Sequence, residues 1–160
     1  MANLTEGAIA PDFTLPRDGG GTVSLSDFKG QSIVLFFYPK DDTSSCTTES
    51  IAFSGLLTEF SAVGTVIIGM SPDSVKKHDK FAKKYDLSVI LASDEDLAVL
   101  NSYGVWVEKS MYGRKYMGVE RTTLLIGPDG LIRRIWPKVK VAGHAEEVLA
   151  AAKSLANGNV

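Results

Sequence analysis

The sequence predicts an α/β fold with a central mixed sheet flanked by helices. Three continuous apolar runs, residues 33–38, 65–70 and 88–92, have the composition of strands buried on both faces. Segments with helical periodicity follow each run, and this alternation is typical of a parallel α/β core. Residues 121–126 and 131–136 are joined by Gly-Pro-Asp-Gly, which predicts a hairpin that adds antiparallel strands to that core.

An N-terminal hairpin extension is expected in front of this core. Residues 10–15 are apolar, residues 18–21 form a glycine-rich turn signal, and residues 23–25 alternate between apolar and polar. Residues 26–30 predict a single helical turn that a glycine ends.

The helices are predicted from spacing and from their end signals. Apolar residues recur with helical spacing from Phe53 to Phe60, and Gly64 is placed to end that helix. The stretch 71–73, Ser-Pro-Asp, has the capping hydroxyl, proline and acid that are typical of a helix start. A last helix is expected from Gly143.

Residues 105–119 have no clean hydrophobic period and are interpreted as a long surface excursion, which is often functional in a compact domain. No repeat or linker divides the chain. We therefore expect a single domain over residues 1–160.

The composition of the chain argues against several classes of function. The net charge of −2 argues against nucleic acid or an anionic membrane as a partner. No apolar run approaches the about 20 residues that span a bilayer, and the N-terminus lacks the features of a signal peptide, so a cytoplasmic location is expected. His78 and His144 are the two histidines and lie far apart, so neither a metal nor a cofactor is expected.

The single cysteine, Cys46, is a candidate nucleophile. Its neighbours are serines and threonines, it follows a predicted buried strand, and it falls in the first turn of the next helix. Open α/β sheets place their sites at such strand ends, and the free N–H groups of a first helical turn stabilise a thiolate. A reactive thiolate is therefore favoured over a packed cysteine.

The surroundings of Cys46 limit its chemistry. The third position after it is Glu49, so the Cys-x-x-Cys pair of a disulfide reductase is missing. No arginine follows shortly, as a cysteine phosphatase requires, and no histidine is near in sequence. The hydroxyl of Thr43 can hydrogen-bond a small polar electrophile, and a peroxide fits.

The chain resembles the peroxiredoxins, and within them the bacterioferritin-comigratory (Q-type) branch. The resemblance rests on the Pro-x-x-x-Thr-x-x-Cys pattern from Pro39 to Cys46, and it extends through most of the chain. It also includes Ala-Pro-Asp-Phe at 10–13, Met-Tyr-Gly at 111–113 and Val-Glu-Arg-Thr-Thr at 119–123. It implies a thioredoxin-like fold and a thiol peroxidase reaction.

The resemblance also implies roles. Cys46 would be the peroxidatic nucleophile that becomes a sulfenic acid. Thr43 would hydrogen-bond the peroxide and Pro39 would shield the site. Arg121 would hold the thiolate and the leaving oxygen, with Glu49 in a supporting role that orients it. The reaction would reduce hydrogen peroxide and small organic hydroperoxides, in a protein expected to be monomeric.

Two departures from the family pattern affect these expectations. Ser44 and Ser45 replace the usual Pro-Gly, and a backbone that needs glycine would be strained there. The positions where the Q-type branch often has a resolving cysteine are Ile51 and Ala82. An external thiol, namely thioredoxin, glutaredoxin or glutathione, must then reduce the sulfenic acid.

Two other functions stay open. The chain could be a redox-sensing or interaction module in which Cys46 is oxidised once with little turnover, or a protein that exchanges disulfides without peroxide chemistry. His78, on the apolar face of a predicted helix, is interpreted as a packed or half-exposed histidine and not as a base.

Overall fold

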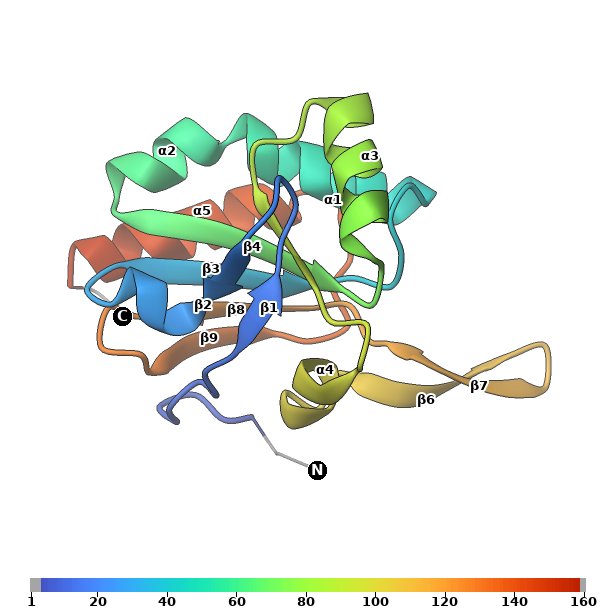
Figure 1. Cartoon of the computed structure of the whole chain (residues 1–160). Coiled ribbons are helices and arrows are strands. Elements are labelled where there is room, and N and C mark those ends of the chain that lie inside the picture. The colour runs from blue at the N-terminus through green and yellow to red at the C-terminus, as the bar shows by residue number, and fades with distance from the viewer. Residues whose placement is uncertain (1–3, 159–160) are drawn as a thin grey trace.

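The centre of the fold is a five-stranded sheet with strand order β5-β4-β3-β8-β9, seen in a computed structural model that describes residues 4–158 (Figure 1). β3, β4 and β5 run parallel, whereas β8 pairs antiparallel with both β3 and β9. The predicted mixed sheet is confirmed, with the hairpin at one edge. Its strands are β3 (Ser32–Phe37), β4 (Thr65–Ser71), β5 (Ile90–Ser93), β8 (Thr122–Ile126) and β9 (Ile132–Trp136).

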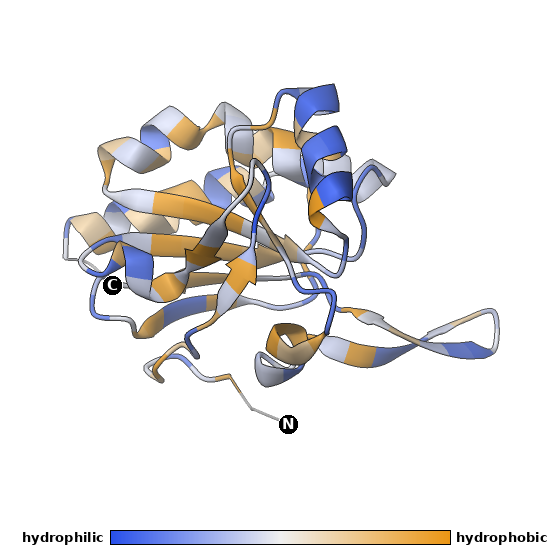
Figure 2. Cartoon of the chain, viewed as in Figure 1, coloured by the Kyte–Doolittle hydropathy of each residue, from blue (hydrophilic) through white to orange (hydrophobic). Residues whose placement is uncertain are grey.

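The sheet separates two apolar cores because successive side chains of a strand point to opposite faces. On β3, Val34 and Phe36 pack under the helices α1, α2, α3 and α5, with Phe53, Phe60 and Phe81. The alternate residues of β3 pack on the other face against the N-terminal hairpin and α4. Apolar colouring is accordingly concentrated in the central strands (Figure 2).

The N-terminal extension forms as predicted. β1 (Thr14–Pro16) and β2 (Thr22–Ser24) pair antiparallel, and the short 3₁₀ helix η1 (Leu25–Phe28) follows. The backbone N–H of Ser24 donates to Asp27, which closes the start of η1.

The helix predicted through residues 53–60 is two helices. α1 (Ser44–Gly55) ends at a glycine, which has a low helix propensity, and α2 (Leu57–Ala62) begins after Leu56. The chain then turns through Gly64, which has a positive φ of 67°, as the sequence predicts. The other helices are α3 (Val75–Tyr85), α4 (Ala98–Ser102) and α5 (His144–Ala156).

The start of α3 was predicted wrongly at Ser71. Ser71 is the last residue of β4, and its hydroxyl donates to Asp73. The residue that caps the helix is Ser74, whose side chain accepts from the backbone N–H of Lys77. The Ser-Pro-Asp signal therefore belongs to a buried loop in front of the helix.

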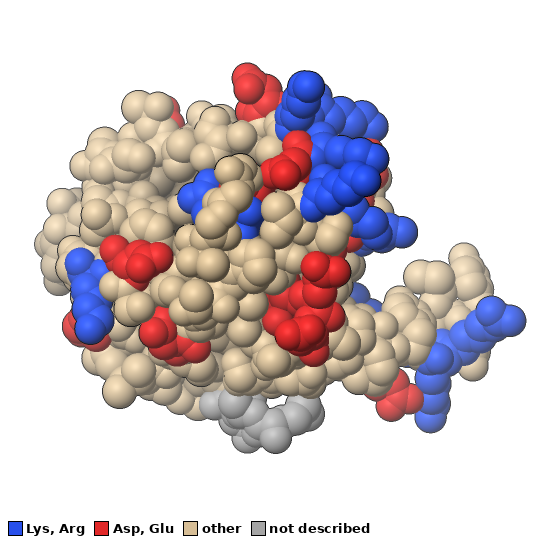
Figure 3. All heavy atoms as spheres, viewed as in Figure 1, with Lys and Arg blue, Asp and Glu red and all other residues tan. Residues whose placement is uncertain are grey.

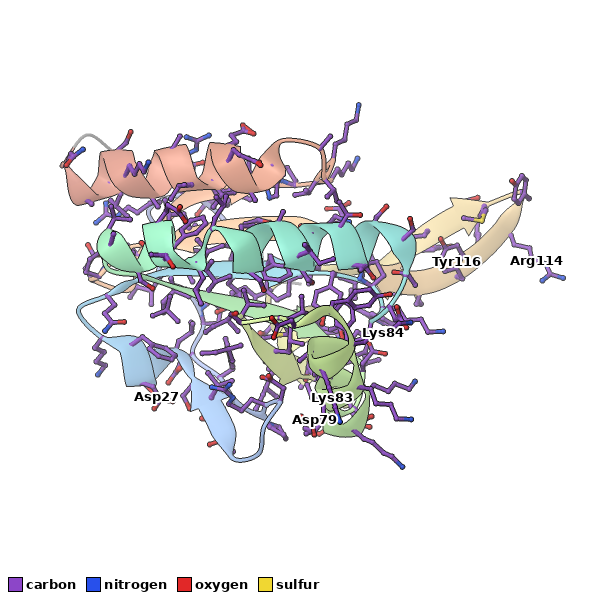
Figure 4. The ribbon with its side chains drawn as sticks, turned by 90° about the horizontal axis from the view of Figure 1, so that it is seen from above. Asp27, Asp79, Lys83, Lys84, Arg114 and Tyr116 are labelled. Atoms are coloured by element: carbon purple, nitrogen blue, oxygen red, sulfur yellow. The ribbon has the colours of Figure 1, made fainter. Side chains whose placement is uncertain are left out.

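Residues 105–119 form the expected surface excursion, and its regular structure, a two-stranded arm, was not predicted. β6 (Trp106–Met111) pairs antiparallel with β7 (Arg114–Val119). Most of its side chains are exposed on both faces, so the burial that creates a period-two pattern is missing. The arm projects from the body and carries Arg114 and Tyr116 near its far end (Figure 4).

The surface seen in Figure 3 has its densest group of basic side chains over α3. Five lysines of this helix are exposed: Lys76, Lys77, Lys80, Lys83 and Lys84. No helix among the described residues is long and apolar enough to cross a membrane.

Candidate active site

Cys46 lies buried in the first turn of α1. β3 ends at Phe37, and a polar loop then leads to Thr43, the residue that precedes the helix. The Cys46 side chain is 1% exposed. Unpaired backbone N–H groups and the positive end of the helix dipole meet at such a position, and both favour an anion.

Arg121 reaches this cysteine from a distant part of the chain. It directly precedes β8, and the pairing of Phe37 with Thr122 brings it to the end of the sheet where β3 stops. Its Nη2 donates to Sγ of Cys46 at 3.1 Å, and its Nη1 donates to Oε1 of Glu49 at 2.6 Å. One guanidinium therefore bridges the sulfur and the carboxylate.

Burial sets the electrostatics of the Arg121–Glu49 ion pair. Glu49 is 1% exposed, and burial raises its pKa to about 7 against the opposing effect of Arg121. Burial also disfavours the charge of Arg121, but Glu49 and Cys46 outweigh it and raise the pKa of the guanidinium. Arg121 is thus cationic at neutral pH, while Glu49 changes its charge there.

Pro39 and Thr43 lie in the loop between β3 and α1. Pro39 is half-buried and Thr43 is exposed. Oγ1 of Thr43 donates to the carbonyl oxygen of Lys40 at 2.9 Å. Among the described residues, no hydrogen bond joins the side chains of Thr43 and Cys46. Arg121 contacts Cys46 directly and Glu49 contacts Arg121, whereas Thr43 takes no part in these hydrogen bonds.

The expected strain at Ser44 and Ser45 is not found. Both residues belong to the first turn of α1, and neither has the positive φ that would favour glycine. Since helical φ and ψ suit any L-residue, serines fit this turn without a backbone penalty.

Burial and the charge of Arg121 act on the pKa of two basic residues outside the predicted set. Burial lowers the pKa of Lys109, on β6, and the charge of Arg121 lowers it further. Burial likewise lowers the pKa of His144, whose Nε2 lies 2.9 Å from Oγ1 of Thr123. Lys109 was missed because residues 105–119 have no period that would place it on a strand beside Arg121.

Comparison with known proteins identifies the family. The AhpC/TSA family profile matches residues 7–135. A Coxiella burnetii protein named as a bcp peroxiredoxin is 50% identical over 147 residues, which cover 92% of this chain and 97% of that protein. Peroxiredoxin Bcp of Bacillus subtilis is 45% identical over 93% of this chain and 95% of its own length.

A solved structure supports the same family assignment. The bacterioferritin comigratory protein of Xanthomonas campestris, described for its alkyl peroxide reduction activity, superposes with a TM-score of 0.86 at 45% identity, over 90% of this chain and 92% of that one. The expected thioredoxin-like fold is thereby confirmed. These relatives favour a peroxidase over a redox-sensing module, with a peroxide as substrate and a thiol as reductant. The chain therefore belongs to the AhpC/TSA family, as a peroxiredoxin of the Bcp (Q) type, and is a thiol-dependent peroxidase.

Proposed function

We propose that Cys46 is the peroxidatic nucleophile of this enzyme and that Thr43, Arg121 and Pro39 complete its site. The observation that carries the proposal is the 3.1 Å hydrogen bond from Arg121 to Sγ of Cys46. A cation that donates to sulfur stabilises the thiolate, and the thiolate is the attacking form of a cysteine. Glu49 orients the guanidinium through its own hydrogen bond.

In the oxidation step the sulfur of Cys46 attacks one peroxide oxygen. A sulfur–oxygen bond forms and the oxygen–oxygen bond breaks, so the sulfur is oxidised to a sulfenic acid. The leaving oxygen takes the electron pair of the broken bond and then a proton, which yields water or an alcohol. The cation of Arg121 lies where this negative charge develops.

Thr43 supports this step as a hydrogen-bond acceptor. Its one hydroxyl proton is donated to the carbonyl oxygen of Lys40, so its oxygen is left to accept from the O–H of the peroxide. Pro39, half-buried in the same loop, limits the access of water to the sulfur.

The reduction step needs a thiol from outside the chain, because Cys46 is the only cysteine. A first thiol condenses with the sulfenic acid to give a mixed disulfide and water, and a second thiol releases the Cys46 thiol and forms an external disulfide. Thioredoxin, glutaredoxin and glutathione are the candidate reductants.

The proposed substrates are hydrogen peroxide and small organic hydroperoxides. The Xanthomonas relative, with its alkyl peroxide reduction, supports the organic substrates. We further propose that residues 1–160 act as one domain, as a monomer and in the cytoplasm; these three expectations remain predictions.

Stopped-flow measurement of Cys46 oxidation tests the proposal. Hydrogen peroxide and tert-butyl hydroperoxide should each oxidise the protein far faster than free cysteine, and mass spectrometry should find the added oxygen on Cys46. Cys46→Ser is the control and should not react. A rate equal to that of free cysteine would refute the peroxidatic role, and a single stoichiometric oxidation with no turnover on added thioredoxin, glutaredoxin or glutathione would support the sensor instead.

A further inference from the structure

The buried histidine of α3 is bonded at both ring nitrogens. His78 has no exposed surface, which confirms the interpretation of it as a packed histidine. Nδ1 lies 2.6 Å from Oδ2 of Asp41, and Nε2 lies 3.0 Å from the carbonyl oxygen of Ala92. Since a carbonyl oxygen can only accept, Nε2 carries a proton, and the contact with Asp41 needs a second proton between Nδ1 and Oδ2.

Asp41 connects this histidine to the loop of the active site. It lies between Pro39 and Thr43, in the segment that joins β3 to α1. Its Oδ1 accepts from the hydroxyl of Tyr38 at 2.6 Å, and its backbone N–H donates to Oδ2 of Asp73 at 2.7 Å. A single loop residue is thus bonded to three separate parts of the molecule.

The position of Asp41 affects the position of the groups that are proposed to contact the peroxide. It follows Lys40, whose carbonyl oxygen accepts the hydroxyl proton of Thr43. Thr43 is in turn the residue before α1, and its carbonyl oxygen accepts from the backbone N–H of Thr47, one residue beyond Cys46. A shift of Asp41 would therefore move both the threonine hydroxyl and the first turn that carries the sulfur.

We propose that His78 is a positioning residue which, through the proton it shares with Asp41, holds this loop in place for the oxidation of Cys46. Loss of that proton loosens the loop. The inference deepens the proposed function and rests on the peroxidatic role of Cys46.

The proton is what makes the contact attractive. When one of the two protons is lost, one N–H remains for two acceptors, the Asp41 carboxylate and the carbonyl oxygen of Ala92. Whichever ring nitrogen keeps the proton, the other nitrogen then faces an acceptor, so the ring no longer joins the loop to β5 through two hydrogen bonds and its hold on Asp41 weakens. Whether the shared proton is formally on nitrogen or on oxygen does not alter this.

The charged groups around the ring determine when the proton leaves. Burial lowers the pKa of His78, but the hydrogen bond and charge of Asp41 and the charge of Asp73 outweigh it and raise the pKa. Tyr38 is neutral, because burial raises its own pKa well above the usual value. On α3 itself, Lys77 lies 4.0 Å from Oδ1 of Asp73 and opposes the imidazolium.

The direction of the pH effect follows from this raised pKa. The stabilisation is complete below the ordinary histidine pKa of about 6.5, and it is lost as the pH rises through the higher pKa of the folded protein. The loop should accordingly be held most firmly at low pH and loosened as the pH rises through the raised pKa of His78.

The experiment measures the second-order rate of Cys46 oxidation by hydrogen peroxide from neutral to alkaline pH, in the full chain. The wild-type rate should fall as the pH rises through the raised pKa of His78. His78→Asn keeps an amide donor near the place of Nδ1 but cannot titrate, so it should retain most of the neutral rate and lack this fall. His78→Leu should be slower than the wild type by about tenfold or more at the low end of this range, and the difference should narrow as the pH rises.

Asp42→Asn is the matched control. Asp42 follows Asp41 in the loop and is bonded to Lys84 and to the hydroxyl of Tyr85, both on α3, but it is exposed. An exposed pair contributes little, so its rate and pH profile should equal those of the wild type. A fall in rate that persists unchanged in His78→Asn would overturn the proposal.

Nuclear magnetic resonance gives a second readout that does not depend on activity. The chain has two histidines, so His144→Gln assigns the ring signals of His78. His78 should lose its second ring proton above the ordinary histidine pKa, and Asp41→Asn should shift that loss to lower pH. If His78→Leu fails to fold, this measurement and the rate of His78→Asn still test the positioning role of His78. If Cys46 is not the nucleophile, the wild type itself will lack fast oxidation, which distinguishes that failure from a failure of the positioning role.

Discussion

The guanidinium of Arg121 donates to the sulfur of Cys46 across 75 positions of sequence. The antiparallel pairing of β3 with β8 makes this contact possible, since both residues lie where these strands meet the same end of the sheet. Glu49, one helical turn after the cysteine, takes the other nitrogen of the same guanidinium. The geometry of the nucleophile therefore depends on the register of the sheet as well as on α1.

Replacing Arg121 should slow the oxidation of Cys46 without abolishing the fold. Arg121→Ala removes a donor to the thiolate and to the leaving oxygen, so the second-order rate with peroxide should fall about a hundredfold or more. Arg121→Lys should recover only part of it, because an ammonium group cannot bond Sγ and Glu49 in the same forked geometry.

The control for this experiment is Arg133→Ala. Arg133 belongs to a partly exposed pair with Asp129 at the turn between β8 and β9. Its loss should leave the rate unchanged, since the pair contributes little and lies at the end of β8 opposite to Arg121. Equal rates for Arg121→Ala and the wild type would contradict the role of Arg121.

The free energy of unfolding should depend on pH through the titration of Glu49. Burial raises its pKa to about 7 in the folded chain, whereas the unfolded value is near 4.5. The folded state thus holds its proton more tightly, and this contribution is complete below the unfolded pKa and lost as the pH rises through about 7.

Urea unfolding of the wild type and of Glu49→Gln over that range provides the measurement. The free energy of unfolding of the wild type, relative to the variant, should decrease between about pH 4.5 and about pH 7 and then level off. A difference that is constant across the range would show that Glu49 does not titrate there.

Thr43 should tolerate serine but not valine. Thr43→Ser keeps the hydroxyl that donates to Lys40 and accepts from the peroxide, so oxidation should slow only slightly. Thr43→Val has nearly the same shape without the hydroxyl, and we expect a loss of about tenfold to a hundredfold in the rate with peroxide. Far-ultraviolet circular dichroism should find both variants folded. A Thr43→Val enzyme with the wild-type rate would exclude the hydroxyl from the reaction.

Much of the fold follows from local pattern. β3, β4 and β5 come from apolar runs, β8 and β9 flank a strong turn signal, and polar residues mark the start of α1, so these elements could be predicted from neighbouring residues alone. The arm of β6 and β7 could not, because its strands are solvated on both faces and pair only with each other.

The partners within the site were harder to predict than its nucleophile. The serines and threonines around Cys46 indicate a candidate nucleophile. Arg121 was assigned through the family resemblance, since no residue near it in sequence indicates a contact with a sulfur 75 positions away. The bond between Asp41 and His78 spans 37 positions and was not predicted at all. The packing of the loop, α3 and β5 decides which polar groups become buried together. This packing leaves no periodic pattern in the sequence, so the contact could not be predicted from it.

Ala82 is the position at which a second cysteine should change the catalytic cycle. It is half-buried on α3 and packs against the same apolar core as Cys46. In Ala82→Cys, the sulfenic acid formed on Cys46 has a thiol of the same chain available, and the two can condense with the loss of water.

Because Cys46 is 1% exposed and bonded to Arg121, this disulfide requires the first turn of α1 to move. We therefore expect oxidation of Ala82→Cys at the wild-type rate, followed by a slower first-order step.

Mass spectrometry after one equivalent of peroxide should separate the two cycles. The wild type should keep an added oxygen on Cys46, whereas Ala82→Cys should have lost two hydrogen atoms and gained no oxygen. Ile51→Cys is the comparison: it is exposed and five residues beyond Cys46 in α1, where an intact helix directs the two side chains to different sides. It should form the disulfide more slowly than Ala82→Cys. A sulfenic acid that persists in Ala82→Cys would show that the first turn of α1 does not open far enough to reach α3, and the external thiol would then have to reach the sulfur by a different path.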